Sequence, residues 1–199
     1  MFDIVSEFET KIANFFGAPY AVATDCCTHA IELCLRYTNA NNLTIPTHTY
    51  LSVPMTAMKL NLIWQWSELD WKNYYYLTDN IIDAAVLWQP KSYISGTYMC
   101  VSFQFRKHLS LGRGGIILLD NAQARDDLIK LSYDGRYRNI SWPEQNISSF
   151  GYHYYMTPET AKLGLDKLET AINTPPKIWG TDDYPDLRNM PVFNQDRLR

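Results

Sequence analysis

Residues 101–115 read VSFQFRKHLSLGRGG, and this stretch decides how the rest of the chain is interpreted. A short β-like run at 99–103 leads into a polar turn that carries Lys107. Two glycines at 114–115 follow, and a second apolar run at 116–119 begins at once. A lysine between two buried strands, followed by a glycine pair, indicates a loop that approaches a ligand closely, because glycine leaves room for such an approach. Most lysines in loops of this kind are only solvated, so the interpretation depends on the other segments.

Length and composition are those of an ordinary globular protein. With 199 residues, 46% of them hydrophobic and 20% charged, the chain is expected to form one soluble domain with a substantial core. A net charge of −3 and a pI near 5.8 argue against a nucleic-acid or anionic-membrane partner, which requires a basic field. No apolar run approaches membrane-spanning length and no leader pattern opens the chain, so we expect a cytoplasmic location.

The four cysteines, Cys26, Cys27, Cys34 and Cys100, show no metal-ligand spacing, so no metal is predicted. Adjacent cysteines such as Cys26 and Cys27 rarely bridge each other, because the geometry is strained. We therefore expect free thiols in a reducing compartment. Aromatic residues make up 14% of the chain, which fits a packed core, an oligomer interface or a stacking site equally well.

Hydrophobic periodicity predicts that strands and helices alternate, which implies an α/β domain with a mostly parallel sheet. The stretches 68–76 and 135–152 are expected to be irregular, with an edge hairpin possible in the second. Prolines beyond Thr174 forbid long elements, so the tail should be extended and pack across the body or a partner. The expected helices span residues 3–16, 28–35, 52–60, 122–133 and 157–172, and the expected strands span 20–24, 43–46, 62–66, 81–85, 99–103 and 116–119.

Two strand ends carry candidate binding residues. The strand at 20–24 is followed by a tight turn at 25–27 and a helix that Thr28 opens. The first amides of such a helix have no backbone partner, and its dipole favours an anion, although an ordinary N-capped helix has the same pattern. The apolar run 81–85 carries Asp83, which either caps the following segment or contacts a ligand at the carboxyl end of its strand.

In sequence order these signals resemble the DegT/StrS-type family of fold-type-I, PLP-dependent sugar aminotransferases. Ser102 stands five residues before Lys107, and the glycine pair stands seven and eight after it, which is the family spacing. The segment 25–31 is similar to the family's small-Gly-Thr-x-Ala-Leu phosphate loop, and 45–50 resembles its Pro-x-x-Thr-aromatic segment. The further similar segments are residues 8–17, 20–22, 81–85 and 151–168, so that the resemblance covers most of residues 5–170.

The resemblance implies a role for each matching residue. Lys107 would join pyridoxal 5'-phosphate (PLP) as a Schiff base and later move a proton between substrate and cofactor carbons. Asp83 would pair with the pyridine nitrogen, and Tyr50 would stack on the ring. Cys27, Thr28 and Ser102 would hold the phosphate.

The resemblance also implies a homodimer with shared active sites. His153 stands where the family has an asparagine that reaches the phosphate of the neighbouring subunit. The implied reaction moves an amino group from an amino acid, L-glutamate by expectation, to a keto acceptor, which in this family is a nucleotide-linked keto-sugar. A non-catalytic relative that binds PLP or a partner, and a transaminase for small 2-oxo acids, remain alternatives. A nucleic-acid module that uses the basic cluster 106–108 is disfavoured by the acidic charge.

Several positions depart from the family pattern. Cys27 replaces a loop glycine, Val86 a histidine or glutamine, Arg113 an acidic residue and Tyr155 an arginine. The stretch between Asp70 and Ile81 is too short for the elements that the family has there, and the C-terminal small domain is expected to be absent. The predicted fold is therefore a three-layer α/β sandwich that resembles a reduced large domain of fold-type-I PLP enzymes, formed by residues 1–172 and followed by an extended Pro-rich tail at 173–199.

Overall fold

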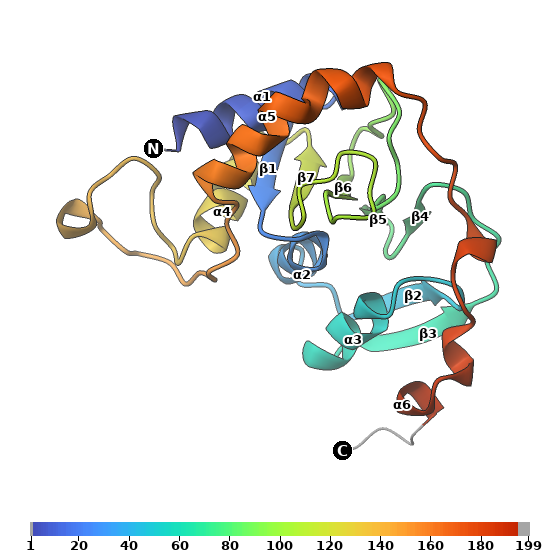
Figure 1. Cartoon of the computed structure of the whole chain (residues 1–199). Coiled ribbons are helices and arrows are strands. Elements are labelled where there is room, and N and C mark those ends of the chain that lie inside the picture. The colour runs from blue at the N-terminus through green and yellow to red at the C-terminus, as the bar shows by residue number, and fades with distance from the viewer. Residues whose placement is uncertain (1, 195–199) are drawn as a thin grey trace.

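The computed structural model describes residues 2–194, which form a central five-stranded sheet and a separate two-stranded sheet (Figure 1). The central sheet has the order β1-β7-β6-β5-β4. Its strands are β1 (Tyr20–Thr24), β4 (Tyr75–Tyr76), β5 (Ile81–Asp83), β6 (Tyr98–Ser102) and β7 (Gly115–Leu119), and the small sheet pairs β2 (Asn42–Pro46) with β3 (Ile63–Ser67) in parallel.

The prediction of a mostly parallel sheet is wrong. Only β5 and β6 are parallel neighbours in the central sheet, whereas β7 is antiparallel to both β1 and β6, and β4 is antiparallel to β5. The connections explain the difference. Residues 103–114 join β6 to β7 and residues 77–80 join β4 to β5, both without a helix, and parallel neighbours need a longer crossover. The element β4 itself falls within a stretch that the sequence predicted to be irregular.

Helices cover both faces of the central sheet, so the expected layering of an α/β domain is present. Along β1, Ala21 and Ala23 join one hydrophobic cluster with α1 and α5, while Val22 joins the other with α2 and α4. Strands buried on both faces are continuously apolar, as β7 is. The helices are α1 (Asp3–Phe16), α2 (Cys27–Tyr37), α3 (Ser52–Lys59), α4 (Ala122–Ser132) and α5 (Pro158–Asn173), and α3 packs against the small sheet.

The start of α5 is as predicted. The Thr157 hydroxyl accepts a hydrogen bond from the Thr160 amide at 3.3 Å, and Pro158 occupies the first turn, where its missing N–H costs nothing. The four cysteine thiols are free. In the described part of the chain, no helix is long and apolar enough to cross a membrane.

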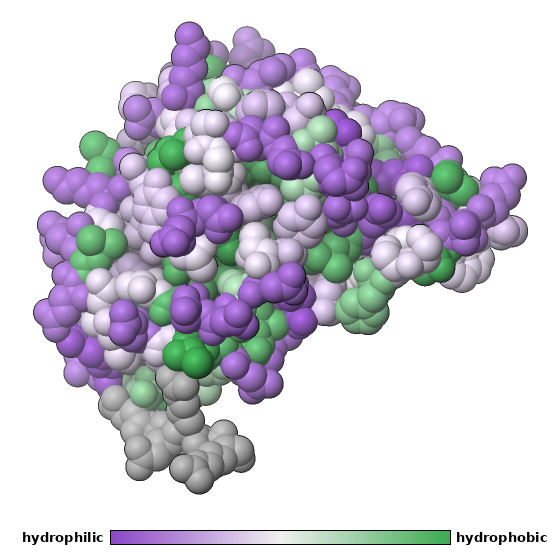
Figure 2. Space-filling model, turned by 180° about the vertical axis from the view of Figure 1, so that it is seen from behind, coloured by the Kyte–Doolittle hydropathy of each residue, from purple (hydrophilic) through white to green (hydrophobic). Residues whose placement is uncertain are grey.

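The connection from α4 to α5 projects from the body (Figure 1). It contains one short 3-10 helix, η1 (Trp142–Glu144), and large exposed apolar side chains that include Trp142 and Phe150. From behind, apolar side chains stand among hydrophilic ones on this projection (Figure 2). An ion pair between Arg138 and Glu9 of α1 ties the projection to the body.

The tail returns along the body after α5 and passes beside the small sheet (Figure 1). The Trp71 amide donates to the Thr181 hydroxyl at 3.0 Å, and the Leu187 amide donates to the Thr47 carbonyl at 2.9 Å. Its elements are short, as the prolines predicted: η2 (Thr181–Asp183), η3 (Leu187–Asn189) and α6 (Pro191–Asn194). Residues 195–199 of the predicted tail lie outside the described residues, and the division at residue 172 stays a prediction.

Candidate active site

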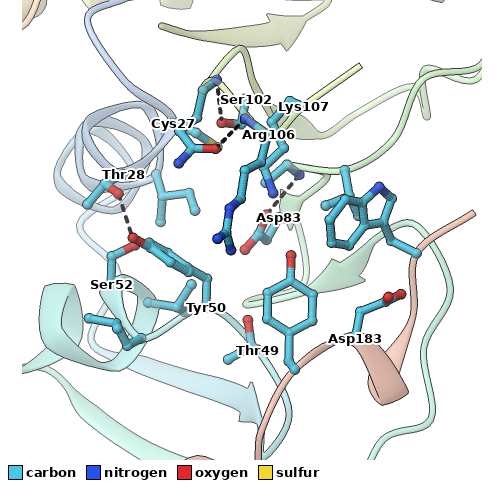
Figure 3. Close-up of a pocket in the computed structure, with 18 of the residues that line it drawn as sticks. Cys27, Thr28, Thr49, Tyr50, Ser52, Asp83, Ser102, Arg106, Lys107 and Asp183 are labelled. Atoms are coloured by element: carbon cyan, nitrogen blue, oxygen red, sulfur yellow. Dashed lines mark hydrogen bonds between the residues drawn. The ribbon is translucent and has the colours of Figure 1, made fainter. Parts of the chain in front are cut away.

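A cavity of about 640 Å³ opens at the edge of the central sheet where β5 and β6 end (Figure 3). Because these two strands are parallel, Asp83 and Ser102, their last residues, lie at the same edge. The N-terminus of α2 forms a second wall, and tail residues such as Trp179 and Tyr184 form a third. Six of the seven predicted site residues line this cavity: Cys27, Thr28, Tyr50, Asp83, Ser102 and Lys107.

Asp83 is a buried carboxylate with two hydrogen-bond donors. Its Oδ1 accepts from the Ala85 amide at 2.9 Å, and its Oδ2 accepts from the Tyr75 hydroxyl at 2.5 Å. Burial raises the pKa of Asp83, whereas these two hydrogen bonds and the charge of Lys107 act in the opposite direction. Burial outweighs them, so the pKa of Asp83 is raised overall. The site thus holds a buried carboxyl group that can pair with a ligand cation.

The sequence did not identify Tyr75 as part of the site. It lies opposite Asp83 in the register of β4 and β5, and its side chain is 4% exposed. Burial, and then the nearby Asp83 charge, raise the pKa of Tyr75 well above its usual value, so the hydroxyl keeps its proton and donates it. The Thr49 hydroxyl forms a short hydrogen bond with Tyr75, which extends the chain of donors.

Lys107 lies in the turn between β6 and β7. The Gln104 side chain shapes this turn by accepting a hydrogen bond from the Arg106 amide at 2.9 Å. Burial lowers the pKa of Lys107, the charges of Asp83 and Cys27 raise it, and the Arg106 charge lowers it further, with a net decrease. An amine with a lowered pKa is a better nucleophile at neutral pH. Its Nζ lies 5.1 Å from the centroid of the Trp179 ring.

The N-terminus of α2 has no capping side chain, since the N-cap residue Cys26 forms no such bond. The Thr28 hydroxyl donates to the Ser52 hydroxyl at 2.9 Å, so both hydroxyls stand at this wall (Figure 3). An uncapped helix start flanked by hydroxyls suits a phosphate or another anion.

Residues 114 and 115 need to be glycine for a different reason from the one that the sequence suggested. A Cβ on Gly115 would lie 2.4 Å from the Cys27 amide nitrogen, and a Cβ on Gly114 would lie 3.2 Å from the Phe103 side chain. The glycines therefore let β7 approach α2 and the core, rather than a ligand. They still shape the site, because this approach sets the position of the α2 start.

Tyr50 and His153 lie at different places relative to the cavity. Tyr50 stands at the rim with 54% of its surface exposed. His153 does not line the cavity of its own chain. Its imidazole is exposed and lies 2.8 Å from the Asp134 carboxylate.

One group near the cavity has metal-ligand chemistry. Ligand atoms of Asp25, Cys26 and His29 lie within 4.8 Å of one another. The Arg113 guanidinium lies 2.7 Å from the Asp25 carboxylate and already supplies a cation there. Although burial opposes it, hydrogen bonds to Asp25 and Cys26 raise the pKa of His29 to about 9. The contacts between these groups form an ion-pair network centred on Asp25.

Taken together, the cavity offers an anion site, a buried carboxylate and an amine of lowered pKa. These groups suit a ligand that carries a phosphate, a protonated ring nitrogen and a carbonyl carbon. Cavities of this size accommodate such a ligand together with a small second molecule. The arrangement on Lys107 and Asp83 therefore fits the cofactor that the resemblance implied.

Comparison with known proteins gives one family. The sequence model of the DegT/DnrJ/EryC1/StrS aminotransferase family matches residues 2–92 and 94–174. No curated protein matches the chain.

Among solved structures, AtS13 from Actinomadura melliaura superposes with a TM-score of 0.73 and 21% identity, over 84% of this chain and 60% of that one. The sugar aminotransferase CalS13 from Micromonospora echinospora gives 0.68 and 15% identity, over 85% and 61%. Spr1654 from Streptococcus pneumoniae, in its PLP form, gives 0.67 and 17%, over 84% and 59%. Identities this low show the fold alone, and the chain spans about 60% of the length of these proteins.

Proposed function

The chain belongs to the DegT/DnrJ/EryC1/StrS aminotransferase family, and from this premise we propose that it is a PLP-dependent aminotransferase. The observation that carries the proposal is that the Lys107 amine, with its lowered pKa, lines the same cavity as the buried carboxylate of Asp83. The similarity to Spr1654, which has been solved in PLP and PMP forms, supports the choice of cofactor.

Each wall of the cavity has a part in holding PLP. The start of α2, with Thr28 and Ser102, would bind the phosphate, and Tyr50 would cover the ring. Asp83 would hold the ring nitrogen in its protonated state. When bound, PLP supplies an electron sink that lets an amino group be exchanged for a keto group.

Lys107 carries the proton transfer in this proposal. Its lowered pKa allows Nζ to be neutral, so that it can take a proton from a substrate carbon and return it. Tyr75 and the Ala85 amide donate to the Asp83 carboxyl group and favour its ionised form against the effect of burial. The tail residue Trp179 covers Lys107 on one side and reduces its contact with water.

The proposed donor is L-glutamate, and the proposed acceptor is a nucleotide-linked keto-sugar. The sugar aminotransferase CalS13 supports the sugar class. A small 2-oxo acid is the second candidate, because tail residues occupy one side of the cavity and narrow the space for a large acceptor.

We also propose a homodimer in which each subunit completes the other's site. The exposed apolar side chains on the projection between α4 and α5 support an interface there, and the exposed His153 could then face the partner's phosphate site. Light scattering of the PLP-loaded protein should give a dimer mass, and a monomer would contradict this part of the proposal.

Spectroscopy tests the central claim. The protein mixed with PLP should turn yellow, and borohydride should fix the label on the peptide that contains Lys107. Lys107→Ala should lose the label, whereas Lys162→Ala, on the exposed side of α5, should keep it. If Lys107→Ala is labelled like the wild type, the proposed role of Lys107 is wrong.

Addition of L-glutamate should then bleach the yellow band and release 2-oxoglutarate. Retained colour with every amino acid would favour the non-catalytic alternative over the enzyme.

A further inference from the structure

The Arg106 side chain extends into the cavity beside Lys107, with its guanidinium group on the side of Tyr50 and Asp83 (Figure 3). Within residues 2–194, no side chain or carbonyl accepts a hydrogen bond from this guanidinium, and no carboxylate pairs with it. Its Cζ lies 5.8 Å from the centroid of the neighbouring Phe105 ring, and the residue as a whole is exposed.

The other described arginines have partners. Five of them pair with a carboxylate, and Arg136 lies against the rings of Tyr133 and Trp142 instead. The five pairs are Arg36–Glu32, Arg113–Asp25, Arg125–Asp126, Arg138–Glu9 and Arg188–Asp186. An arginine directed into a cavity without a partner is therefore a local exception.

The two acidic side chains that line the cavity pair with groups other than Arg106. Asp83 accepts from Tyr75 and Ala85, and Asp183 pairs with Lys177 and accepts from the Gly180 amide at 3.0 Å. Arg106 is moreover close enough to Lys107 for its charge to lower the pKa of that amine. The guanidinium is a permanent cation that pairs with no carboxylate in the described part of the chain, so it attracts an anionic ligand into the cavity.

We propose that Arg106 binds a carboxylate of the amino-acid and 2-oxo-acid substrates. The planar guanidinium matches a carboxylate with two parallel hydrogen bonds, and lysine cannot reproduce this fork. The phosphate of the cofactor has its own site at the uncapped start of α2, which leaves Arg106 for the substrate. This inference rests on the proposed function and names the residue that selects carboxylate-bearing substrates.

Arg106→Gln in the PLP-loaded enzyme tests the assignment. The KM for L-glutamate should rise on the order of ten- to a hundredfold, the range expected for loss of hydrogen bonds to a charged group. The Kd for PLP should change less than about threefold, since the phosphate site is untouched. Arg125→Gln, at a partly buried arginine on α4 that does not line the cavity, is the control and should alter neither value.

Arg106→Lys separates charge from geometry. The charged groups that act on Lys107 are Asp83, Cys27 and Arg106. Because a lysine at position 106 keeps the positive charge there, the pH profile of kcat should not shift. The KM should remain raised, because the fork is lost. In Arg106→Gln the same profile should move to higher pH, since a cation that lowers the pKa of Lys107 is gone.

Three results would overturn the inference. The Kd for PLP could rise in Arg106→Gln while the KM is unchanged, which would assign Arg106 to the phosphate. If the KM for L-glutamate and the Kd for PLP both stayed the same in Arg106→Gln, Arg106 would be only a solvated side chain. Thirdly, succinate, used as a carboxylate probe in calorimetry, could bind wild type and Arg106→Gln equally or bind neither.

The succinate measurement also separates the two proposals. If the wild-type protein takes up no PLP, the proposed function fails. Binding of succinate to the protein as purified, weakened at least tenfold by Arg106→Gln, would then still support the carboxylate site.

Discussion

Tyr75 and Asp83 face each other across β4 and β5, and the tyrosine hydroxyl donates to the carboxylate at 2.5 Å. Thr49 continues the chain with a hydrogen bond to the same hydroxyl. A buried carboxylate stays ionised only when donors replace the lost water, and Tyr75 is one of the two that Asp83 has. The relationship couples a strand residue to the charge state of the site.

Tyr75→Phe should raise the pKa of Asp83 further. A carboxyl whose pKa is higher in the folded than in the unfolded state binds more protons when folded, so the folded state loses stability as pH rises through that window. Urea unfolding of the variant should therefore show a loss of about 1.5–3 kcal/mol at neutral pH that shrinks towards pH 4. Tyr74→Phe, at an exposed neighbour, is the control. Equal pH dependence in wild type and Tyr75→Phe would refute the coupling.

The lowered pKa of Lys107 predicts a pH dependence of the opposite sign. The unfolded chain keeps this proton up to about pH 10.4, whereas the folded protein releases it earlier, so this group adds stability as pH rises between the two values. Competitive acetylation should give Lys107 a midpoint below the ordinary lysine value of about 10.4. Lys107→Met should remove the corresponding slope of unfolding free energy at alkaline pH, and an unchanged slope would argue against a lowered pKa.

Gly115→Ala should damage the site without touching any ligand. The added Cβ would meet the Cys27 backbone at 2.4 Å, and backbone cannot move aside as a flexible side chain can. We expect a loss of about 1–3 kcal/mol in stability together with weaker PLP binding, because the start of α2 must shift. Gly114→Ala meets side chains at 3.2 Å and should cost less. Calorimetric unfolding and PLP titration measure both effects, and wild-type values for Gly115→Ala would contradict the prediction.

Arg138→Ala should be strongly destabilising, because it removes one partner of a buried ion pair. Arg138 holds Glu9 with two hydrogen bonds of 2.8 and 2.9 Å, and Glu9 also accepts from the Ala23 amide at 2.7 Å. Both side chains are less than a tenth exposed, at 8% and 7%. Removing the cation leaves a buried, unpaired charge, at a cost of about 3–5 kcal/mol in unfolding free energy.

The matched control is the double variant Glu9→Gln with Arg138→Met. It removes both charges and keeps an acceptor for the Ala23 amide, so it should lose much less stability than Arg138→Ala. A double variant as unstable as the single one would show that packing, not charge, is responsible.

Local patterns predicted most of the elements, and the family resemblance predicted six of the lining residues. The strand at 20–24 and the cap at Thr157 have patterns that a few neighbouring residues determine, and the structure has them as predicted. Sheet direction was mispredicted because it depends on how β6 and β7 are connected, which hydrophobic alternation does not report.

Tyr75 shows why part of the site could not be predicted from the sequence. The run 74–76 contains three tyrosines, of which the middle one is 4% exposed and its neighbours are 37% and 42% exposed. Alternation of buried and exposed side chains indicates a strand, but three identical residues in a row show no such alternation in the sequence. Trp179 and Tyr184 were missed for another reason. Their positions depend on contacts with residues 71–73, about a hundred positions earlier in the chain. No local sequence pattern predicts such contacts.

Because the cavity is lined by side chains from Cys26 to Met190, a partly synthesised chain lacks the wall that the tail forms. Residues 2–174 leave the ribosome before the tail does, and Trp71 then lacks Tyr184, whose ring lies 5.6 Å away in the complete fold. During that interval the Trp71 ring is without the cover that the tail gives it. The tail wall of the cavity is therefore complete only after translation has passed residue 190.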